Sequence, residues 1–415
     1  MAITHQPRFT VSDTTISLSD LAVLAVALAG AAALPVHADR LRGSRWIWIT
    51  TVAFLALIFA ASLYPRLFDS EYHWKTHLVT AAKYAEYAVL APAVVLLVRD
   101  ARALARLLAT AAVLSVAAAV VAVLQYFGLD ILGAWPSGWR QPSFVGVSEL
   151  GALGAAALAI GFVGLLRPGS VERRIAYAAL AGGTVCVVLS GGIAAELAVV
   201  LAAAGAVLLV AAKDGIGWKR VGVVGAITVV CGLGVLGLRH GDLTQYARYI
   251  GLAKADESTN KDTQTFAQRE LMYYLGVRVW LDRPLFGAGW QSIREQQVYG
   301  PFLDDAHHRY PDQPEQAFPN AADPLRQYGI DNAYIQALAE MGVVGLGLFL
   351  VVLGAGLVYG VKRALRAPPE AAMRALVGVL WLLVAIGTWA GQGLVAGASF
   401  AALSWFALGL VASGR

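Results

Sequence analysis

Long runs of apolar residues constrain this chain more than any other feature. Several of them reach the roughly 20 residues that a helix needs to cross the hydrocarbon core of a membrane. Apolar residues make up 58% of the chain and charged residues 14%, against roughly 45–50% and 25% in soluble globular domains. This composition excludes a cytosolic enzyme, a disordered chain and a nucleic-acid-binding domain. We predict eleven spans, near residues 21–36, 46–63, 77–98, 104–127, 147–166, 175–190, 193–212, 220–238, 342–361, 375–391 and 394–413.

The distribution of Lys and Arg predicts the orientation of these spans. One set of connections carries sixteen basic residues, whereas the alternate short connections carry only three, Arg66, Lys75 and Arg140. Basic residues gather in cytoplasmic connections, so we expect the first set to be cytoplasmic. The N-terminus is then outside and the C-terminus inside, in agreement with an odd number of spans.

One connection, residues 239–330, is far longer than the others and falls on the outer side. Loops longer than about 15 residues are usually functional or disordered, and this one contains enough apolar and aromatic residues to fold. We predict a helix over residues 266–281, which ends before Pro284 because proline disfavours a helical conformation of the residue before it. A glycine-rich turn over 287–290 follows, and residues 301–324, with five prolines, are predicted to be irregular.

These features predict an all-α integral membrane protein with about 11–12 transmembrane helices and one large, mostly helical outer loop. We divide the chain into an N-terminal bundle (1–238), a loop domain (239–330) and C-terminal transmembrane helices (331–415). The two cysteines lie in apolar runs, and the adjacent His307 and His308 have no third ligand at helical spacing. The sequence therefore predicts no metal site.

Ionisable side chains inside or at the ends of spans are costly and are candidates for function. Glu149 and Glu196 are two of them, near the outer ends of their spans. A structural role inside the bundle stays open for both. Lys83 and Glu86 are three residues apart on one helix and are expected to neutralise each other. Glu340 is expected to have a packing or capping role.

The outer connections also carry arginines that suit phosphate groups. Arg269 and Arg278 lie on the predicted loop helix, and Arg140 lies in a shorter outer connection. The planar guanidinium group binds phosphate through two parallel hydrogen bonds. The alternative is a solvated helix face with surface arginines. Trp135 and Trp139, beside Arg140, suit either interfacial anchoring or stacking on sugar rings.

Five separated stretches form an ordered set. They are LQYFG (124–128), PSFVG (142–146), LSGG (189–192), Arg269 followed by WLDRPLFGAGW (280–290), and DNAYIQ (331–336) followed by EMGVVG (340–345). In this order, and with a single large outer loop, they resemble the O-antigen ligase and O-antigen polymerase superfamily. The resemblance covers roughly residues 80–360.

The resemblance implies an integral membrane glycosyltransferase of the GT-C type that uses no metal ion or other cofactor. Members of the superfamily take a glycan from an undecaprenyl diphosphate carrier at the outer face of the bacterial inner membrane, so the large loop is expected in the periplasm. Ligases pass the glycan to lipid A-core, and polymerases pass it to another carrier-linked unit. The expected partners are therefore this donor, one of these acceptors and membrane lipids, and no nucleic acid.

The resemblance also implies roles for particular residues, with two departures. Arg269 matches an arginine that is expected to bind the donor diphosphate. The superfamily usually has a second arginine in the short outer turn, where this chain has Gly191 and Gly192. It usually has a histidine where this chain has Asp331. Two expected groups are thus absent from their usual positions.

We take Asp331 and Arg269 as the candidate catalytic residues. A carboxylate accepts a proton as a general base, and a guanidinium group offsets the charge of a leaving diphosphate. Asp331 has an alternative role as a cap on a short helix predicted over 333–341. The candidate substrate-binding residues are Arg140, Arg278, Asn332, Tyr334 and the reserve bases Glu149 and Glu196. Either Arg140 or Arg278 would replace the missing arginine.

Ligation of a glycan to lipid A-core is the function we favour, and two others stay open. A divergent polymerase with its own residue set would show the same motifs. A flippase for lipid-linked sugars would not need a charged outer loop of roughly 90 residues, and its charged residues would follow an internal path.

Overall fold

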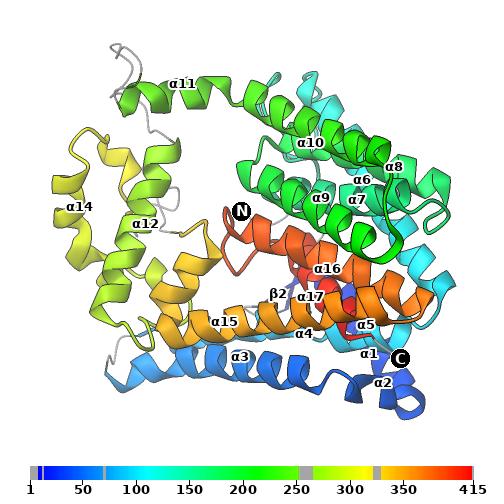
Figure 1. Ribbon diagram of the computed structural model, residues 1–415. Helices are drawn as coiled ribbons and strands as arrows, with labels where there is room; N and C mark the ends of the chain where they lie inside the picture. Colours follow the sequence, from blue (N-terminus) through cyan, green and yellow to red (C-terminus); the bar gives the residue numbers. More distant parts are fainter. Residues whose placement is uncertain are drawn as a thin grey trace.

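The structure is a computed structural model that describes residues 8–11, 14–68, 72–250, 252, 265–320 and 329–413. Long helices dominate it (Figure 1). Two short antiparallel strands, β1 (Arg8–Val11) and β2 (Thr14–Ser17), precede the first helix. The hydroxyl of Ser17 accepts a hydrogen bond from the backbone amide of Asp20 and so caps the start of that helix.

Among the described residues, ten helical segments are long and apolar enough to cross a membrane. They are α1 (Leu18–His37), α3 (Arg45–Leu63) continued by η1 (Tyr64–Leu67), α4 (Trp74–Ala88) continued by α5 (Leu90–Leu97), α6 (Ala101–Tyr126), α7 (Val147–Leu166), α8 (Arg173–Ser190), α9 (Ile193–Asp214), α10 (Trp218–Leu238), α15 (Ala333–Arg366) and α16 (Pro369–Trp389). A further apolar helix, α17 (Ala398–Ala412), is shorter, and α2 (Asp39–Arg42) is a single turn. Each of the eleven predicted spans coincides with one of these helices, so the prediction of an all-α integral membrane protein is confirmed.

The long connection forms short helices around one longer helix. The longer helix, α12 (Thr265–Asp282), confirms the helix predicted over 266–281. The others are α11 (His240–Tyr249), η2 (Ser292–Arg294), α13 (Gln296–Tyr299), η3 (Gly300–Phe302), α14 (Leu303–Arg309) and η4 (Glu315–Ala317). The expectation of irregular chain was wrong for α14, because Pro301 and Pro311 lie outside this helix and leave its backbone hydrogen bonds intact. Residues 321–324 of that stretch lie outside the described residues.

The bundle and the long connection have separate apolar cores. In the bundle, α7 and α16 are buried on nearly all sides. In the long connection, α12 buries Leu271, Leu275 and Val279, which lie one helical turn apart on a single face. Arg269 lies on the opposite face, because two residues correspond to about 200° of helix rotation. In Figure 1, α12 and α14 form a group beside the ends of α3 and α15.

The glycine-rich turn after α12 fits into a break in α15. At Gly342 the backbone has φ 65° and ψ −165°, so α15 consists of a short helix before this residue and a long helix after it. The backbone amide of Ala288 donates to the carbonyl of Ala339 at 2.9 Å. The backbone amide of Val343 donates to the carbonyl of Pro284, also at 2.9 Å. The turn thus binds backbone groups that the break leaves without helical partners.

Two glycines make this close approach possible. A Cβ atom on Gly287 would lie 2.3 Å from the carbonyl carbon of Glu340, and one on Gly342 would lie 2.2 Å from the carbonyl oxygen of Leu285. Both glycines also have a positive φ, which side chains disfavour. The turn predicted over 287–290 and the short helix predicted over 333–341 are both confirmed.

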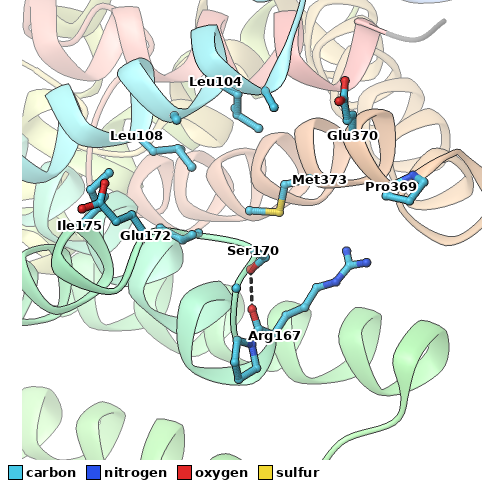
Figure 2. A pocket seen from close by; sticks show the side chains of 14 residues that line it. Leu104, Leu108, Arg167, Ser170, Glu172, Ile175, Pro369, Glu370 and Met373 are labelled. Carbon is cyan, nitrogen blue, oxygen red and sulfur yellow. Dashed lines mark hydrogen bonds between the residues drawn. The ribbon is translucent and has the colours of Figure 1, made fainter.

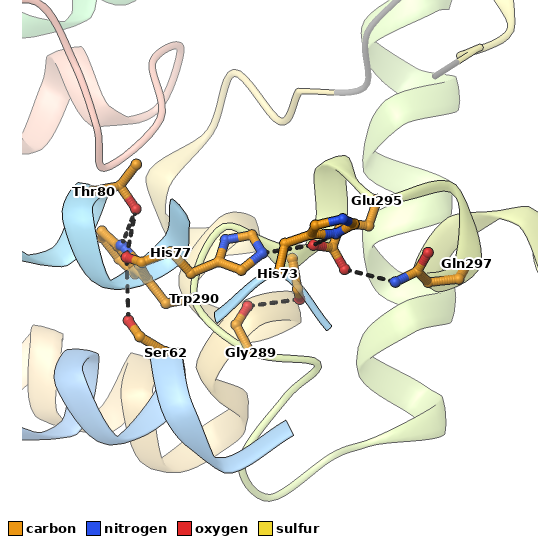
Figure 3. Close-up of polar contacts among 9 residues, drawn as sticks. Ser62, His73, His77, Thr80, Gly289, Trp290, Glu295 and Gln297 are labelled. Carbon is orange, nitrogen blue, oxygen red and sulfur yellow. Dashed lines mark hydrogen bonds and ion pairs between the residues drawn. The ribbon is translucent and has the colours of Figure 1, made fainter. Parts of the chain in front are cut away.

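Beyond the turn, the chain is fixed to α3 and α4. Trp290 is fully buried, and its indole N–H donates to the hydroxyl of Thr80 at 3.1 Å. Figure 3 shows the neighbouring polar contact, in which the carboxylate of Glu295 lies against His77 of α4 and His73, the residue before α4. The distance from His77 Nε2 to Glu295 Oε1 is 2.7 Å, and both side chains are largely buried.

Candidate functional site

The structure brings the two candidate catalytic residues together. Arg269 is in the second turn of α12, and Asp331 lies immediately before the residue that caps α15. The distance between Arg269 Nη2 and Asp331 Oδ2 is 3.8 Å, and the two side chains are 31% and 61% exposed. This is a loose, solvent-accessible ion pair, of a kind that contributes little to stability. Both groups are therefore available to a ligand.

A tyrosine that the sequence reasoning missed connects these two residues. Tyr273 follows Arg269 by one turn of α12, and its hydroxyl donates to the backbone carbonyl of Asp331 at 3.1 Å. Burial raises the pKa of Tyr273, the nearby Arg269 opposes this, and the charge of Asp331 adds to it. The i, i+4 spacing was the available signal in the sequence.

The helix cap is Asn332, so the capping alternative for Asp331 is wrong. Asn332 Oδ1 accepts hydrogen bonds from the backbone amides of Tyr334 and Ile335 at 3.0 and 3.1 Å. Its side-chain amide donates to the carbonyl of Ala390 at 3.1 Å. The side chain of Asp331 makes no hydrogen bond to the described residues at the start of the helix. Because Asn332 fixes the backbone at the next position, it also fixes the position of Asp331.

Tyr334 also has a structural partner. Its hydroxyl donates to the carbonyl of Ile386 in α16 at 2.9 Å. Asn332 and Tyr334, both expected to bind substrate, thus join the start of α15 to the end of α16. These hydrogen bonds go to backbone groups of the two helices and not to Arg269. Asn332 and Tyr334 therefore position Asp331.

A second cationic group lies at the turn between α8 and α9. A Cβ atom on Gly191 would lie 3.2 Å from Cβ of Arg140 and 3.7 Å from Cγ of Arg239. Gly191 has φ 57° and closes the end of α8. Two arginines from other segments therefore converge on the turn where the superfamily usually supplies one of its own.

Arg239 is the functional candidate that sequence reasoning did not identify. It follows the end of α10, and only 2% of its side chain is exposed. Its guanidinium group donates to Asp242 Oδ2 at 2.8 and 3.1 Å and lies 4.6 Å from the ring centre of Phe266 in α12. An arginine at the outer end of a span, among connections that are poor in basic residues, was the signal for it.

Charge connects this turn to the first pair. Burial lowers the pKa of Arg140, and the positive charges of Arg239 and Arg269 lower it further, while Asp242 opposes them. Arginine nevertheless stays protonated in proteins. Arg140 also lies 4.8 Å from the ring centre of Trp135. Three arginines from different segments therefore act on one region, and a bound anion would relieve their mutual repulsion.

Three other candidates have contacts with residues outside this group. Arg278 pairs with Asp305 of α14, and nine residues of helix place it on the face of α12 opposite Arg269. Glu149 is buried and accepts hydrogen bonds from the side chain of Gln392 and the backbone of Gly397, at 3.1 and 3.0 Å. Glu196 faces α10 near Gly232.

The other ionisable groups within the spans have structural contacts. Lys83 Nζ lies 2.7 Å from Asp20 Oδ2, so the ion-pair partner of Lys83 is Asp20 and not the expected Glu86, on which Lys83 acts only through charge. A pairing rule for one helix does not consider a carboxylate on a neighbouring helix. Glu340 is fully buried and accepts a hydrogen bond from Gln336 at 2.9 Å, consistent with its expected packing role.

Two cavities bear on function. One of about 500 Å³ is almost wholly apolar and lies between α1, α5 and α17. It is closed on one side by Leu132, Phe144 and Val145 from the connection that also carries Arg140. The other cavity, of about 390 Å³, lies at the opposite ends of the helices (Figure 2). Among the described residues, no group of His, Cys, Asp and Glu side chains has the geometry of a metal site.

The fold and this cluster define a multi-pass membrane protein with a cationic site where its long connection meets the bundle. Comparison with known families identifies the class further: residues 176–350 match the family described as O-antigen ligase. The match includes Gly191, Arg239 and Arg269, and it continues through Asp331 into α15. It confirms the resemblance to the O-antigen ligase and polymerase superfamily, whose members are glycosyltransferase-like enzymes of O-antigen processing. No curated protein matches the chain.

Proposed function

We propose that this protein is an O-antigen ligase, which transfers a glycan from an undecaprenyl diphosphate carrier to lipid A-core on the periplasmic side of the inner membrane. The observation that carries the proposal is a cationic region: Arg140 and Arg239 flank the turn at Gly191, and Arg269, 3.8 Å from the carboxylate of Asp331, is close enough to act on Arg140 through charge. In this scheme residues 1–238 and 331–415 form the membrane part, and residues 239–330 form the periplasmic domain.

The arginines suit the donor. A carrier diphosphate is already a good leaving group, and its departure mainly requires cationic hydrogen-bond donors for the developing charge. Arg269 provides an accessible guanidinium group, and Arg140 adds a second positive charge near the α8–α9 turn. Arg239 keeps its guanidinium group on Asp242 and contributes mainly through charge. No step of this transfer requires a metal ion.

Asp331 suits the acceptor. An attacking hydroxyl must lose a proton, and a carboxylate within hydrogen-bond reach accepts it. Asp331 is 61% exposed and is not used as a helix cap. The adjacent guanidinium group of Arg269, whose Nη2 lies 3.8 Å from Asp331 Oδ2, carries the opposite charge. Without substrate, Arg269 and Asp331 pair with each other. In the proposed reaction Arg269 would instead bind the donor diphosphate and Asp331 the acceptor hydroxyl.

The apolar cavity suits a lipid-linked substrate. It is lined by α1, α5 and α17 and by Phe144, which is only four residues from Arg140 in the sequence. Four residues of extended chain span at most about 14 Å. A ligand with its diphosphate near Arg140 is therefore within reach of an apolar environment for its hydrocarbon chain.

A transfer assay tests the proposal. The purified protein in lipid vesicles would receive a carrier-linked glycan together with either lipid A-core or a second carrier-linked unit. A ligase forms a glycan joined to lipid A-core, whereas product on the carrier alone indicates the polymerase. Movement of the donor across the vesicle membrane without any transfer would favour a flippase and contradict the proposal.

Reporter fusions test the orientation. A reporter after residue 310 is expected to be periplasmic, and reporters after residues 170 and 215 are expected to be cytoplasmic. The expectation rests on the excess of basic residues in one set of connections. A cytoplasmic signal at residue 310 would place the cationic site on the wrong side of the membrane for this donor.

A further inference from the structure

A second site lies at the ends of the helices farthest from the long connection. The cavity of about 390 Å³ is lined by the start of α6, the connection from α7 to α8, and the start of α16. Figure 2 shows these three segments around it. The chain runs along α7 from Gly146 to Arg167, so this cavity and the arginine cluster are on opposite sides of the bundle. Nothing in the proposed transfer uses it.

The cavity combines an apolar floor with a charged rim. Leu104 and Leu108 of α6, Ile175 of α8 and Met373 of α16 supply the apolar part. Arg167, Ser170, Glu172 and Glu370 supply the polar part. In Figure 2, Glu172 and Glu370 lie on opposite sides of the cavity, with Ser170 and Arg167 between them. An apolar floor with a charged rim, at the ends of membrane-spanning helices, suits an amphiphile.

The rim carries both signs of charge. Helices α8 and α16 begin at this cavity without a side-chain cap, and uncapped helix starts present free backbone N–H groups that favour anions, whereas the start of α6 is already capped by the carboxylate of Asp100. Arg167 adds a guanidinium group, whose Nε lies 3.1 Å from Asp214. Glu172 caps no backbone group of α8 with its side chain, and Glu172 and Glu370 are exposed. An anionic group and a cationic group of one ligand thus both find partners.

We infer that this cavity binds a phospholipid whose head group carries a primary ammonium, such as phosphatidylethanolamine. The phosphate lies near Arg167 and the helix starts, the ammonium donates hydrogen bonds to Glu172 or Glu370, and an acyl chain covers Leu104 and Leu108. A quaternary ammonium cannot donate such bonds, and an uncharged glycerol head group offers no charge to the carboxylates. Phosphatidylcholine and phosphatidylglycerol should therefore bind more weakly.

Competition between lipids tests the inference. The full-length protein in detergent would be incubated with equal amounts of the three lipids with identical acyl chains, and the bound lipids measured by native mass spectrometry. Exposed ion pairs are individually weak, so we expect a roughly two- to tenfold preference for phosphatidylethanolamine over phosphatidylcholine. Equal retention of the two lipids would overturn the inference.

Variants assign the preference to this cavity. The double variant Glu172→Gln and Glu370→Gln should lose the preference, whereas Asp39→Asn, an exposed carboxylate of α2 outside the cavity, should keep it. If the two carboxylates only stabilise helix starts, the double variant will melt at a lower temperature with its lipid preference unchanged, which would contradict the inference.

Two further measurements establish whether the ligand of this cavity is a lipid. Ala105 is exposed and lines the cavity, so Ala105→Trp should fill the cavity without disturbing the buried core and should reduce retention of phosphatidylethanolamine. Soluble phosphoethanolamine in large excess should displace little lipid, because it lacks the acyl chain that the apolar floor binds. Full displacement would mean that the site takes a soluble ligand, and would overturn the lipid assignment.

Discussion

The long connection meets the bundle in two regions that are built in opposite ways. At the first, the turn over residues 284–289 fills the break at Gly342 through backbone hydrogen bonds, and there is no space for a single additional carbon atom at Gly287. At the second, Arg269 and Asp331 approach only to 3.8 Å and stay accessible to solvent. One region is a rigid joint, and the other is open to a ligand.

The two regions share the short helix at the start of α15. That helix ends at the joint and begins at Asn332, next to Asp331. A shift of the joint would therefore move Asp331 relative to Arg269, because a helix of nine residues transmits displacement along its axis. The glycine motifs and the charged residues have different tasks: the glycines set the position, and the charged side chains perform the chemistry.

The largest effect is expected from breaking the joint. Gly287→Ala places a Cβ atom 2.3 Å from backbone and imposes a strained φ. Strained φ costs about 1–3 kcal/mol, and overpacking typically costs about the same. We expect little folded protein in size-exclusion chromatography. Gly300→Ala is the matched control, because its nearest neighbour would lie at 3.6 Å. Equal yields of the two variants would show that the joint tolerates movement.

The next largest effect is expected from the open region. Asp331→Asn keeps the shape of the side chain but removes its capacity to accept a proton, so transfer should fall by about 10²–10⁴-fold. Because Asn332 provides the helix cap, the thermal stability should be unchanged. Asp312→Asn, at an exposed position of the same connection, serves as the control in the transfer assay. Full activity of Asp331→Asn would assign the base to another residue.

The sequence allowed most of the fold and the two parts of the joint, the turn over 287–290 and the helix over 333–341, to be predicted, for a physical reason. The fit of the turn into the break at Gly342 was not predicted. A membrane imposes a minimum apolar length on every span, and backbone that approaches other backbone closely requires glycine. Both constraints are local, so they are visible in the apolar runs and in Gly287, Gly289 and Gly342. The short helix α14 was missed because the number of prolines was considered and their positions relative to the helix were not.

The candidate site could be predicted only in part. Arg269 and Asp331 were identified through motifs, but Arg239 depends on the approach of α10 to the α8–α9 turn, which no local pattern encodes. Arg278 was expected near the diphosphate, yet its pairing with Asp305 depends on where α14 packs. Which arginines lie close together depends on how distant segments pack, and the spacing of the arginines along the chain does not reveal it.

A smaller effect is expected when the charge is kept and only its geometry changes. Arg269→Lys retains a cation but loses the planar group that forms two parallel bonds to phosphate. Transfer should weaken by about 1–3 kcal/mol, the range for hydrogen bonds to charged groups. Arg309→Lys, at an exposed position of α14, is the control. Near-normal turnover of Arg269→Ala would remove this residue from the mechanism and leave the arginines at Gly191 as the donor site.

The smallest effect concerns Tyr273, which joins the two candidate catalytic residues from the side of α12. Tyr273→Phe removes the hydrogen bond to the carbonyl of Asp331 and should cost about 0.5–1.5 kcal/mol of stability. Burial raises the pKa of Tyr273 above its ordinary value of about 10. The folded state therefore favours the protonated phenol, so this stabilisation is complete below pH 10 and is lost as the pH rises through the raised pKa.

Melting temperatures at increasing pH test this last expectation. The difference between the natural protein and Tyr273→Phe should be constant up to about pH 10 and should shrink at higher pH, because only the natural protein can lose the phenolic proton. Tyr274→Phe is the control from the next position of α12, where the ring packs against Tyr310 in the loop core. Equal melting temperatures of the two proteins at every pH would mean that Tyr273 contributes through its ring alone, because Phe keeps the ring. Asp331 would then be positioned from α15 and not from α12, and the open region would depend entirely on the rigid joint.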